Sequence, residues 1–433
     1  MAKRLIVIGA GPMGLAAAYY AAKRGLEVEV IEADDRPGGM AAHFDFEGLS
    51  IERFYHFCCL SDADTLALMG ELGIADKMKW VATSMGYFVD GQLYKWGEPF
   101  SLLFFPKLDL ISKIRYGLQM FTATKRSDWR KLDGIAATQW FKDWAGARAY
   151  DVLWRRLMEL KFHDYADRVS AAWMWQRIKR LGNSRASLFE ERLGYIDGGS
   201  AALIEALVTA ITAMGGKIHL SSPARRILIA EGRVRGVETR EGRQIMADEV
   251  ISTIPTPYVP ALLEGAENDL LAPYRRIENI GCVCVVLKLK RSVSSHFWVN
   301  ISDKRVAVPG LVEFSNLRPL PHAIVYVPFY MPPSHPKFGR ADEDFIADSL
   351  LAIRLVNPDI GADDLIGAHV GRLRHAQPVC ETGFAALIPP AQTSIKGLQI
   401  ADTCFYYPED RGVSESIKFA KGMVERAALR AQA

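Results

Sequence analysis

Three glycines near the start of the chain have the spacing of a dinucleotide phosphate site. Gly9, Gly11 and Gly14 form G-x-G-x-x-G directly after the apolar run 5–8. In this pattern the first glycine turns the chain tightly, the second lets the backbone approach a pyrophosphate, and the third lets strand and helix pack closely. The chemistry expected here is the binding of a phosphate group by free N–H groups at a helix N-terminus.

An acidic residue further along the chain supplies a partner for a ribose. The apolar run 28–31 predicts a second strand, and Glu32 ends it, about twenty residues past the glycines. A carboxylate there accepts hydrogen bonds from a ribose 2′-OH and repels a 2′-phosphate. Pro12 suits the first turn of the intervening helix, where its missing N–H would be unpaired anyway. Strand, helix, second strand and acid together favour a nucleotide site over a chance glycine turn.

The residues that follow resemble a second fingerprint. Glu32, Arg36, Gly38 and Gly39 form E-x-x-x-R-x-G-G. This pattern resembles that of the flavin amine oxidoreductase superfamily, which includes protoporphyrinogen oxidases, phytoene desaturases, amine oxidases and, more distantly, UDP-galactopyranose mutases. The resemblance implies an FAD cofactor. Met40 stands where these families usually have Arg, so any flavin or substrate contact of that Arg is not carried over.

The C-terminal segment is similar to the last fingerprint of the same superfamily. It has an apolar run 398–401, then Asp402, a loop, Gly412 and a helix. The resemblance implies that Asp402 accepts a hydrogen bond from a ribitol hydroxyl. It also implies that the helix beginning at 412–414 points its positive end at the pyrimidine side of the isoalloxazine. Cys404 does not match the position of the cysteinyl flavin of some amine oxidases, so we expect FAD to be non-covalent.

The resemblance extends to a middle segment and to a candidate for the substrate site. A Gly198-Gly199 turn leads into a helix, and in the resembling flavoproteins the strand end near Ala224 contacts the adenine through backbone atoms. The segment around His56 lines the flavin in those families, so His56 is our candidate catalytic residue. The alternative is a hydrogen-bonded histidine beside buried aromatic side chains. The residues expected to bind FAD are Gly9, Gly11, Pro12, Met13, Gly14, Glu32, Ala33, Arg36, Gly38, Gly39, Met40, Ala224, Asp402, Gly412 and Val413.

The elements that position these residues predict an α/β protein with two interleaved domains, because 433 residues exceed the size at which one core keeps growing. A discontinuous Rossmann-like FAD-binding domain is expected over 1–50, 193–260 and 390–433. An α+β substrate-binding domain with a helical lid is expected over 51–192 and 261–389. Within it we predict a helix over 62–73 with Ser61 as N-cap, a hairpin at Asp90-Gly91, helices throughout 127–190, and strands at 282–290, 323–329 and 369–374. Lys161 and His163 lie in the helical part and could face the site.

The segment 100–121 is the most apolar outside the sheet. Pro106, Lys107 and Asp109 interrupt it well before the roughly eighteen apolar residues that a membrane span requires. Two functional interpretations remain, namely a lid over a lipophilic substrate and an amphipathic segment whose basic residues face anionic lipid. We favour a structural interpretation over both, namely an ordinary core helix of the substrate domain.

Composition excludes several classes of partner. The chain is 49% hydrophobic and 24% charged, and its net charge of +3 is scattered, which argues against nucleic acid. The cysteines at 58, 59, 282, 284, 380 and 404 show no metal-ligand spacing, so we expect reduced core thiols and no metal. The first residues run straight into the nucleotide strand, which leaves no room for a signal peptide. We therefore expect a cytoplasmic protein, with peripheral contact at the inner membrane face as an open alternative.

The resemblance implies an enzyme, and the absence of further motifs narrows its class. There is no second G-x-G-x-x-G for NAD(P)H and no C-x-x-x-x-C, so a pyridine-nucleotide disulfide reductase is not expected. The leading hypothesis is an FAD-dependent oxidase, dehydrogenase or desaturase. It would take hydride from a C–N or C–C bond of an apolar or amphipathic small molecule directly to flavin N5. The alternatives are a non-redox mutase acting on a nucleotide-linked sugar and a flavin-bearing scaffold without turnover. Basic residues in the pocket would favour the mutase, and an apolar tunnel the desaturase.

Overall fold

The computed structural model describes residues 3–187 and 190–432, and β1 (Arg4–Ile8) lies at the centre of a parallel sheet. Leu5 and Val7 contact one hydrophobic core, whereas Ile6 and Ile8 contact a second one. Successive side chains of a strand point to opposite faces of the sheet, so a strand that is apolar throughout must be covered on both faces. The other strands are β2 (Glu27–Ile31), β11 (Lys217–His219), β15 (Glu249–Ser252) and β21 (Leu398–Ile400). Their order is β11-β2-β1-β15-β21, and every pair is parallel.

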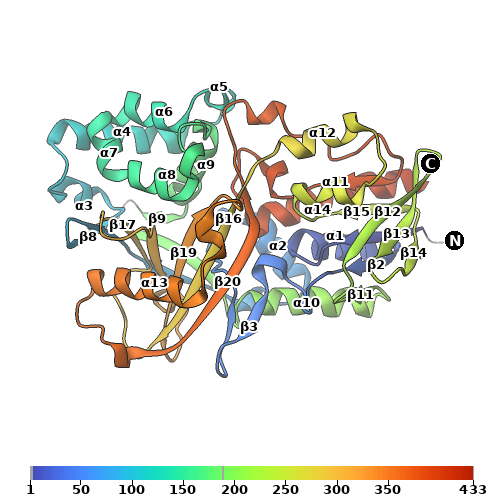
Figure 1. Ribbon diagram of the computed structural model, residues 1–433, viewed down its shortest axis with the longest axis horizontal. Coiled ribbons are helices and arrows are strands. Elements are labelled where there is room, and N and C mark those ends of the chain that lie inside the picture. The colour runs from blue at the N-terminus through green and yellow to red at the C-terminus, as the bar shows by residue number, and fades with distance from the viewer. Residues whose placement is uncertain (1–2, 188–189, 433) are drawn as a thin grey trace.

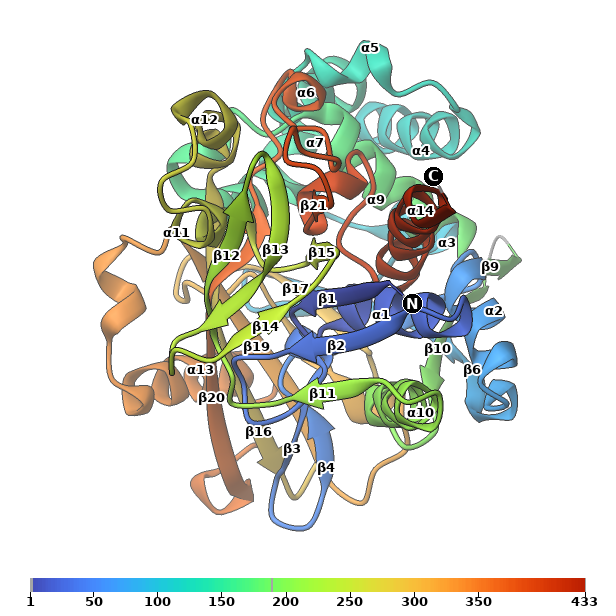
Figure 2. The same cartoon turned by 90° about the vertical axis from the view of Figure 1, so that its right-hand side faces the viewer.

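Helices cover one face of this sheet and an antiparallel meander covers the other (Figure 2). The helices are α1 (Pro12–Lys23), α10 (Ser200–Ala213) and α14 (Val413–Gln432). The meander consists of β12 (Ala224–Ala230), β13 (Arg233–Thr239) and β14 (Gln244–Met246). Ala16, Ala17 and Ala18 of α1 are fully buried, and their small side chains let the helix approach the sheet closely. The strand–helix–strand unit predicted around the three glycines is confirmed.

A seven-stranded sheet lies at the end of the molecule remote from both termini (Figure 1). Its strands are β7 (Met85–Val89), β8 (Gln92–Trp96), β16 (Asn279–Leu289), β17 (Trp298–Ser302), β18 (Gly310–Glu313), β19 (Ala323–Met331) and β20 (Leu365–Pro378). Their order is β20-β16-β19-β18-β17-β7-β8. Cys282 and Cys284 of β16 face the core that includes the helices of residues 99–183, whereas Val283 and Val285 face the core that includes α13 (Asp342–Val356). The strands predicted in this region and the hairpin at Asp90-Gly91 are confirmed.

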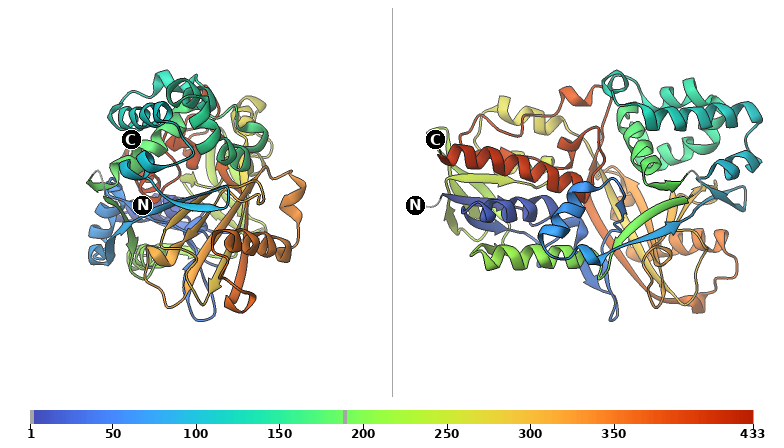
Figure 3. Two further views of the ribbon diagram at one scale, coloured as in Figure 1. Left: turned by 90° about the vertical axis from the view of Figure 1, so that its left-hand side faces the viewer. Right: turned by 180° about the vertical axis from the view of Figure 1, so that it is seen from behind.

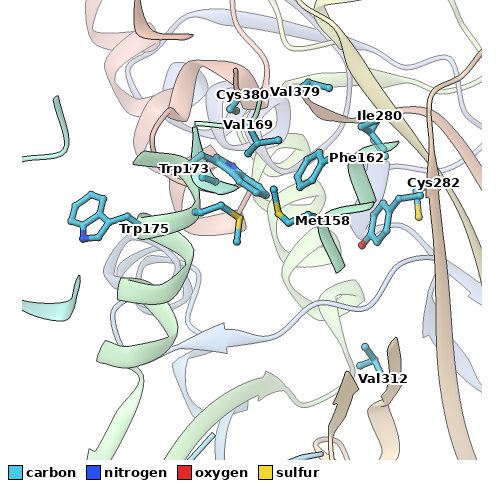
Figure 4. Close-up of a cluster of buried hydrophobic side chains, with 14 of the residues drawn as sticks. Met158, Phe162, Val169, Trp173, Trp175, Ile280, Cys282, Val312, Val379 and Cys380 are labelled. Atoms are coloured by element: carbon cyan, nitrogen blue, oxygen red, sulfur yellow. The ribbon is translucent and has the colours of Figure 1, made fainter. Parts of the chain in front are cut away.

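The helices of residues 99–183 form a lobe beside the seven-stranded sheet, which we call the helical lobe (Figure 1). They are α3 (Pro99–Phe104), α4 (Leu110–Lys125), α5 (Arg130–Asp133), α6 (Ala137–Ala145), α7 (Ala147–Leu153), α8 (Arg155–Phe162) and α9 (Ala171–Asn183). Figure 4 shows Phe162 of α8 and Trp173 and Trp175 of α9 within the buried cluster that reaches Cys282 of β16. These aromatic side chains therefore belong to the core of the lobe.

The prediction of helices throughout 127–190 is wrong at its end. Helix α9 ends at Asn183, and β9 (Arg185–Ser187) pairs with β10 (Glu190–Ile196). Strand β10 also pairs with β5 (Cys58–Cys59) and β6 (Met78–Thr83), partners from more than a hundred residues earlier that periodicity does not reveal. A further hairpin consists of β3 (His43–Asp45) and β4 (Ser50–Glu52).

The remaining helices are α2 (Ala63–Glu71), α11 (Val259–Leu262) and α12 (Asn268–Arg276). The N-cap of α2 is Asp62 and not the predicted Ser61. The Asp62 carboxylate does not cap the helix; it accepts a hydrogen bond from the N–H of Cys59 and pairs with Arg180.

The interpretation of 100–121 as a core helix is also wrong. Phe105 is buried and packs against Tyr87 and Trp96, but Phe104 is 77% exposed and Leu110 is 62% exposed. A lid that turns its apolar side chains into a cavity is excluded for the same reason.

Three further predictions concern membrane spans, metal sites and the state of the cysteines. Within residues 3–187 and 190–432, no helix combines the length and the apolar character that a bilayer span needs. In the same ranges no group of His, Cys, Asp or Glu side chains could hold a metal ion. The six cysteines are buried free thiols, as predicted.

Candidate functional site

The three glycines before α1 have different reasons for lacking a side chain. A Cβ atom on Gly14 would lie 1.9 Å from the carbonyl oxygen of Gly9, and one on Gly9, which has φ of +100°, would lie 2.8 Å from Thr253 Oγ1. These two glycines are required by packing. Around Gly11 an added Cβ would meet no described atom within 4 Å, and its φ of −71° suits any residue. Gly11 therefore keeps open a space in front of α1 that the fold itself does not need.

The second glycine pair lies directly on the first motif. The N–H of Gly38 donates to the carbonyl of Ala10 at 2.8 Å, and a Cβ on Gly39 would lie 3.2 Å from Gly11 Cα. Arg36 donates to the carbonyl of His43 at 2.9 Å, which fixes the loop after the pair, and Met40 lies in the short turn that follows. The two fingerprints thus form one surface around the space at Gly11.

Glu32 lies where β2 ends, beside the glycine turn. Its carboxylate oxygens accept from the N–H of Ala10 at 2.6 Å and of Asp34 at 2.8 Å, whereas Ala33 between them is exposed. The Ser222 N–H donates to the Glu32 carbonyl at 2.7 Å, which brings the chain that leads into β12 alongside. Each carboxylate oxygen retains a second acceptor position, so Glu32 can also receive a ribose hydroxyl.

An internal cavity lies where helix starts meet. It is lined by Pro12, Ser200 and Val413, the first residues of α1, α10 and α14, together with Ala41 and His56. No side chain of the described residues caps the N-terminus of α1. Free N–H groups and the positive end of the helix dipole favour an anion at such a place. The open space at Gly11, the acceptor Glu32 and this cavity fit a bound dinucleotide.

A buried carboxylate that the sequence analysis missed organises the cavity wall. Glu52 accepts from the Ser200 N–H at 3.0 Å, and its carboxylate lies 3.5 Å from His43 and 3.8 Å from Arg318. Burial alone would raise the pKa of Glu52, but His43, Ser200 and Arg318 outweigh it and lower the pKa to about 2. A Cβ on Gly199 would lie 2.7 Å from Arg318, so the glycine turn is packed against this group. No local spacing in the sequence indicates the cluster, because its members come from distant segments.

His56 lines the same cavity. Its Nδ1 is buried and has no hydrogen-bond partner among the described residues. Burial lowers the pKa of His56, which favours the neutral imidazole. A neutral ring with a free nitrogen at a cavity wall can donate to or accept from a bound molecule.

The Asp402 carboxylate links two loops that follow strands of the parallel sheet. The Asp402 carboxylate accepts from the N–H of Thr256 at 2.6 Å and of Cys404 at 2.8 Å, which ties the loop after β15 to the loop after β21. The Glu415 carboxylate lies against Gly412, since a Cβ there would be 1.9 Å from Glu415 Oε2. Burial raises the pKa of Glu415 to about 7.

A group of basic side chains, of which Lys161 is buried and Arg177 and Arg411 are partly buried, includes the residue just before Gly412. Lys161 Nζ is 5.1 Å from the ring centroids of Trp173 and Tyr330, and the Arg177 guanidinium is 4.9 Å from that of Trp173. Arg177 forms an ion pair with Asp410, and Arg411 donates to the carbonyl of Ala376. Lys161 has no hydrogen bond or ion pair within the described ranges, and burial followed by the charge of Arg177 lowers its pKa well below the ordinary value. We call Lys161, Arg177, Asp410 and Arg411 the cationic cluster.

His163, the other residue noted beside Lys161, has a different neighbourhood. Its Nε2 lies 2.8 Å from the carbonyl oxygen of Tyr330, and its ring lies 5.1 Å from that of His335. The sequence analysis noted Lys161 without a spacing to support it, and it missed Arg177, Asp410 and Arg411, which come together only in the folded chain.

Comparisons with known proteins identify the family. The sequence model of the flavin containing amine oxidoreductases matches residues 14–341. The zeta-carotene-forming phytoene desaturase of Myxococcus xanthus is 26% identical over 292 residues, which are 59% of this chain and 54% of that protein. The mitochondrial protoporphyrinogen oxidase of Nicotiana tabacum is 38% identical over 79 residues, 18% of this chain and 16% of that protein. The chain thus spans about half of the length of the desaturase and less of the oxidase.

Solved structures share the whole fold. An oxidoreductase from Methanosarcina mazei has a TM-score of 0.74 at 18% identity, covering 98% of this chain and 100% of that one. A reduced UDP-galactopyranose mutase has a TM-score of 0.76 at 15% identity, covering 98% and 95%. A putrescine oxidase bound to putrescine has a TM-score of 0.73 at 16% identity, covering 99% of both chains. At these identities the likeness shows the fold alone, and it agrees with the predicted α/β class.

Proposed function

The chain belongs to the flavin containing amine oxidoreductases, and on that premise we propose that it is an FAD-dependent oxidoreductase acting on a C–N or C–C bond of an amphipathic substrate. That it is a flavin oxidoreductase follows from the family. The observation that carries the choice of FAD is the open space at Gly11, with the acceptor Glu32 beside it. When bound, FAD supplies the acceptor for a hydride at N5.

The chain's own residues divide the binding of FAD among them. The N-terminus of α1 and the backbone of Gly11 hold the pyrophosphate, and Glu32 accepts from the adenosine ribose. Backbone atoms of Ala224 contact the adenine, Asp402 accepts from a ribitol hydroxyl, and the start of α14 at Val413 lies at the pyrimidine side. His56 orients the substrate or the flavin from the cavity wall. His56 and Val413 line the cavity and Glu32 bonds Ala10 next to Gly11, which supports these roles, whereas the roles of Ala224 and Asp402 follow from the resemblance to the family.

Binding is non-covalent in this proposal. Cys404 is fully buried, and burial followed by the charge of Asp402 raises the pKa of its thiol well above the ordinary value. A thiol held in this form is a poor nucleophile, since the thiolate is the reactive species.

The cationic cluster favours a substrate that carries an anionic group. Lys161, Arg177 and Arg411 are compensated by one carboxylate, that of Asp410, and Lys161 has no ion-pair partner among the described residues. Burial without a partner disfavours the charged form of Lys161, and a carboxylate or phosphate on the substrate would stabilise that form. The flat faces of Trp173 and Tyr330 beside Lys161 suit an adjoining apolar part. We therefore propose a substrate with an acid group at one end.

The division into two domains completes the proposal. The FAD-binding domain comprises 1–50, 193–260 and 390–433, and the substrate-binding domain 51–192 and 261–389. All five strands of the parallel sheet come from the first set of ranges, and all seven strands of the larger sheet from the second.

The cationic cluster also favours one second candidate. A non-redox mutase acting on a nucleotide-linked sugar needs cations for the phosphates of its substrate, and the basic side chains of Lys161, Arg177 and Arg411 meet that need. Such an enzyme requires reduced flavin, whereas the oxidoreductase starts from oxidised flavin.

Acid precipitation of the purified protein tests the cofactor. A yellow supernatant containing FAD is expected. Protein that is colourless and takes up no added FAD would contradict the FAD site, and flavin retained in the pellet would contradict non-covalent binding.

Substrate turnover separates the two candidates. Small molecules that co-purify with the protein are identified by mass spectrometry and then mixed anaerobically with the oxidised enzyme. Bleaching of the flavin band with formation of a product that has lost two hydrogens supports the oxidoreductase. Rapid bleaching by NADPH, with isomerisation of a sugar nucleotide only after reduction, supports the mutase. Substituting Lys161→Met should weaken binding of an acidic substrate and leave flavin content unchanged.

A further inference from the structure

Helix α4 exposes its apolar side to solvent and packs a largely polar side against the protein. Its buried side carries Ser112, Tyr116, Gln119 and Ala123. Its solvent side carries five large apolar side chains, all more than half exposed, with Ile111 at 70%: Leu110, Ile111, Ile114, Leu118 and Phe121. A surface helix of a globular protein normally buries its apolar stripe. This stripe runs from Leu110 to Phe121, about 17 Å at 1.5 Å per residue, within a 16-residue helix.

Helix α3 extends the same apolar face. Three of its side chains, Phe100, Leu103 and Phe104, are half-exposed or more. The helix is attached to α4, because Lys113 Nζ donates to the carbonyl of Leu103 at 2.6 Å and a Cβ on Gly117 would lie 3.7 Å from Leu102. Figure 3 shows both helices at the end of the molecule opposite to the termini. We call the exposed apolar side chains of α3 and α4 the apolar face.

The charges around the apolar face are predominantly positive. Residues 99–131 contain seven Lys or Arg and two Asp, a net charge of +5, while the whole chain has +3. Within the described residues, Lys113, Arg115, Lys125 and Arg126 form no ion pair with an acid. The rest of the chain is therefore slightly acidic, and the positive charge is concentrated where the apolar side chains are exposed.

A groove lies at the C-terminal end of the apolar face. It is lined by Phe121, Thr122, Ala123, Lys125, Arg126, Trp140 and Trp144. Trp144 is 41% exposed. Tryptophan is enriched at the level of lipid headgroups, and lysine and arginine there bind phosphate.

We infer that the apolar face docks on an anionic bilayer surface, with α3 and α4 lying in the interface. The apolar side chains enter the acyl boundary, and the cations of the groove contact lipid phosphates. A second copy of the chain fits the face less well, because an isologous contact would bring the positive rims of both copies together. The inference concerns attachment alone and holds whichever reaction the flavin site performs.

Flotation with vesicles tests the inference. The full chain should float with vesicles of phosphatidylcholine and phosphatidylglycerol, less with phosphatidylcholine alone, and less at high salt. The triple variant Phe104→Ser, Ile114→Ser, Leu118→Ser should reduce partition more than about tenfold, since each side chain contributes burial of apolar area. Lys125→Gln with Arg126→Gln should abolish the preference for the anionic lipid.

Leu351→Ser on α13 is the matched control, because Leu351 is also about half exposed but lies outside the apolar face. It should float like the unsubstituted chain. Equal flotation of the triple variant, or no flotation of the unsubstituted chain, would overturn the inference. A dimer in light scattering that the triple variant abolishes would assign the face to a second copy. Flavin content of the triple variant should be unchanged, which separates this outcome from a failure of the flavin site.

Discussion

Glycines that look equivalent in the G-x-G-x-x-G pattern differ in what they do for the folded chain. Gly14 is required by the contact with the Gly9 carbonyl, whereas Gly11 faces open space. Substituting Gly11→Ala should therefore leave the fold intact and place a methyl group where the pyrophosphate would lie. We expect a normal circular dichroism spectrum and melting temperature without FAD, and at least a tenfold loss of FAD affinity by fluorescence titration.

Two variants serve as controls for this prediction. Gly14→Ala should lower the yield of folded protein, because its Cβ would overlap a backbone carbonyl. Gly70→Ala in α2, where nothing lies within 4 Å, should keep FAD binding and add about 0.5–1 kcal/mol of stability through helix propensity. If Gly11→Ala binds FAD normally, the space in front of α1 is not the pyrophosphate site.

Glu52 should make stability depend on pH. Its pKa is about 2 in the folded chain and near 4.5 when unfolded. The unfolded chain therefore binds a proton first as pH falls, so the stabilisation is complete above about pH 5 and is lost towards pH 2. The difference corresponds to about 3 kcal/mol. Urea unfolding between pH 5 and pH 2.5 should show a smaller pH slope for Glu52→Gln than for the unsubstituted chain.

The exposed Glu264 offers a control for the pH measurement. Glu264→Gln should leave the slope unchanged, because an exposed carboxylate has similar surroundings in both states. Equal slopes for all three proteins would mean that the contacts with His43, Ser200 and Arg318 do not hold Glu52 ionised.

At the scale of single elements, α4 shows how tertiary packing can oppose the usual distribution of side chains. Gln119 is completely buried, and neither atom of its amide has a hydrogen-bond partner among the described residues. Gln119→Met keeps the unbranched shape and removes the unpaired polar group. The free energy of unfolding should rise by about 1–3 kcal/mol, measured by urea denaturation.

The neighbouring Leu118 is an exposed apolar residue on the same helix and tests the opposite substitution, from apolar to polar. It is 56% exposed, so Leu118→Gln should change stability by less than about 0.5 kcal/mol in solution. Loss of stability in Gln119→Met would indicate that ordered water satisfies the buried amide. A large loss in Leu118→Gln would indicate that the apolar face is packed against protein.

At the scale of the whole molecule, the residues assigned to the proposed flavin site come from distant parts of the chain. Gly11 comes from the first strand–helix turn, Ala224 from the middle of the chain and Val413 from the last helix. A ligand that binds only the folded chain stabilises it by mass action. At one hundred times its dissociation constant, FAD should add about 2.7 kcal/mol to the free energy of unfolding.

Thermal melting at increasing FAD concentration measures this linkage. The melting temperature should rise with the logarithm of the FAD concentration and should stay constant for Gly11→Ala. FMN, which lacks the adenosine half, should stabilise the chain much less. An equal effect of FMN would contradict the assignment of Glu32 to a ribose.

The parallel sheet and its glycine turns could be predicted from the sequence because their determinants are local. A strand buried on both faces must be apolar throughout, and the turn before α1 has room only for glycine at positions 9 and 14. The same holds for the Asp90-Gly91 hairpin, where both residues have positive φ. Such features depend on neighbours within a few residues, and the pattern records them directly.

What only the tertiary structure decided depends on contacts between distant segments. The strand β10 forms because β5 and β6 offer it partners, and Glu52 is held ionised by His43, Ser200 and Arg318. The cationic cluster joins α8 and α9 to the loop before α14. The helical period of the sequence predicts the apolar stripe of α4 but not whether the stripe faces the protein or the solvent. The stripe faces the solvent because the opposite face of α4 packs against α6 and α9.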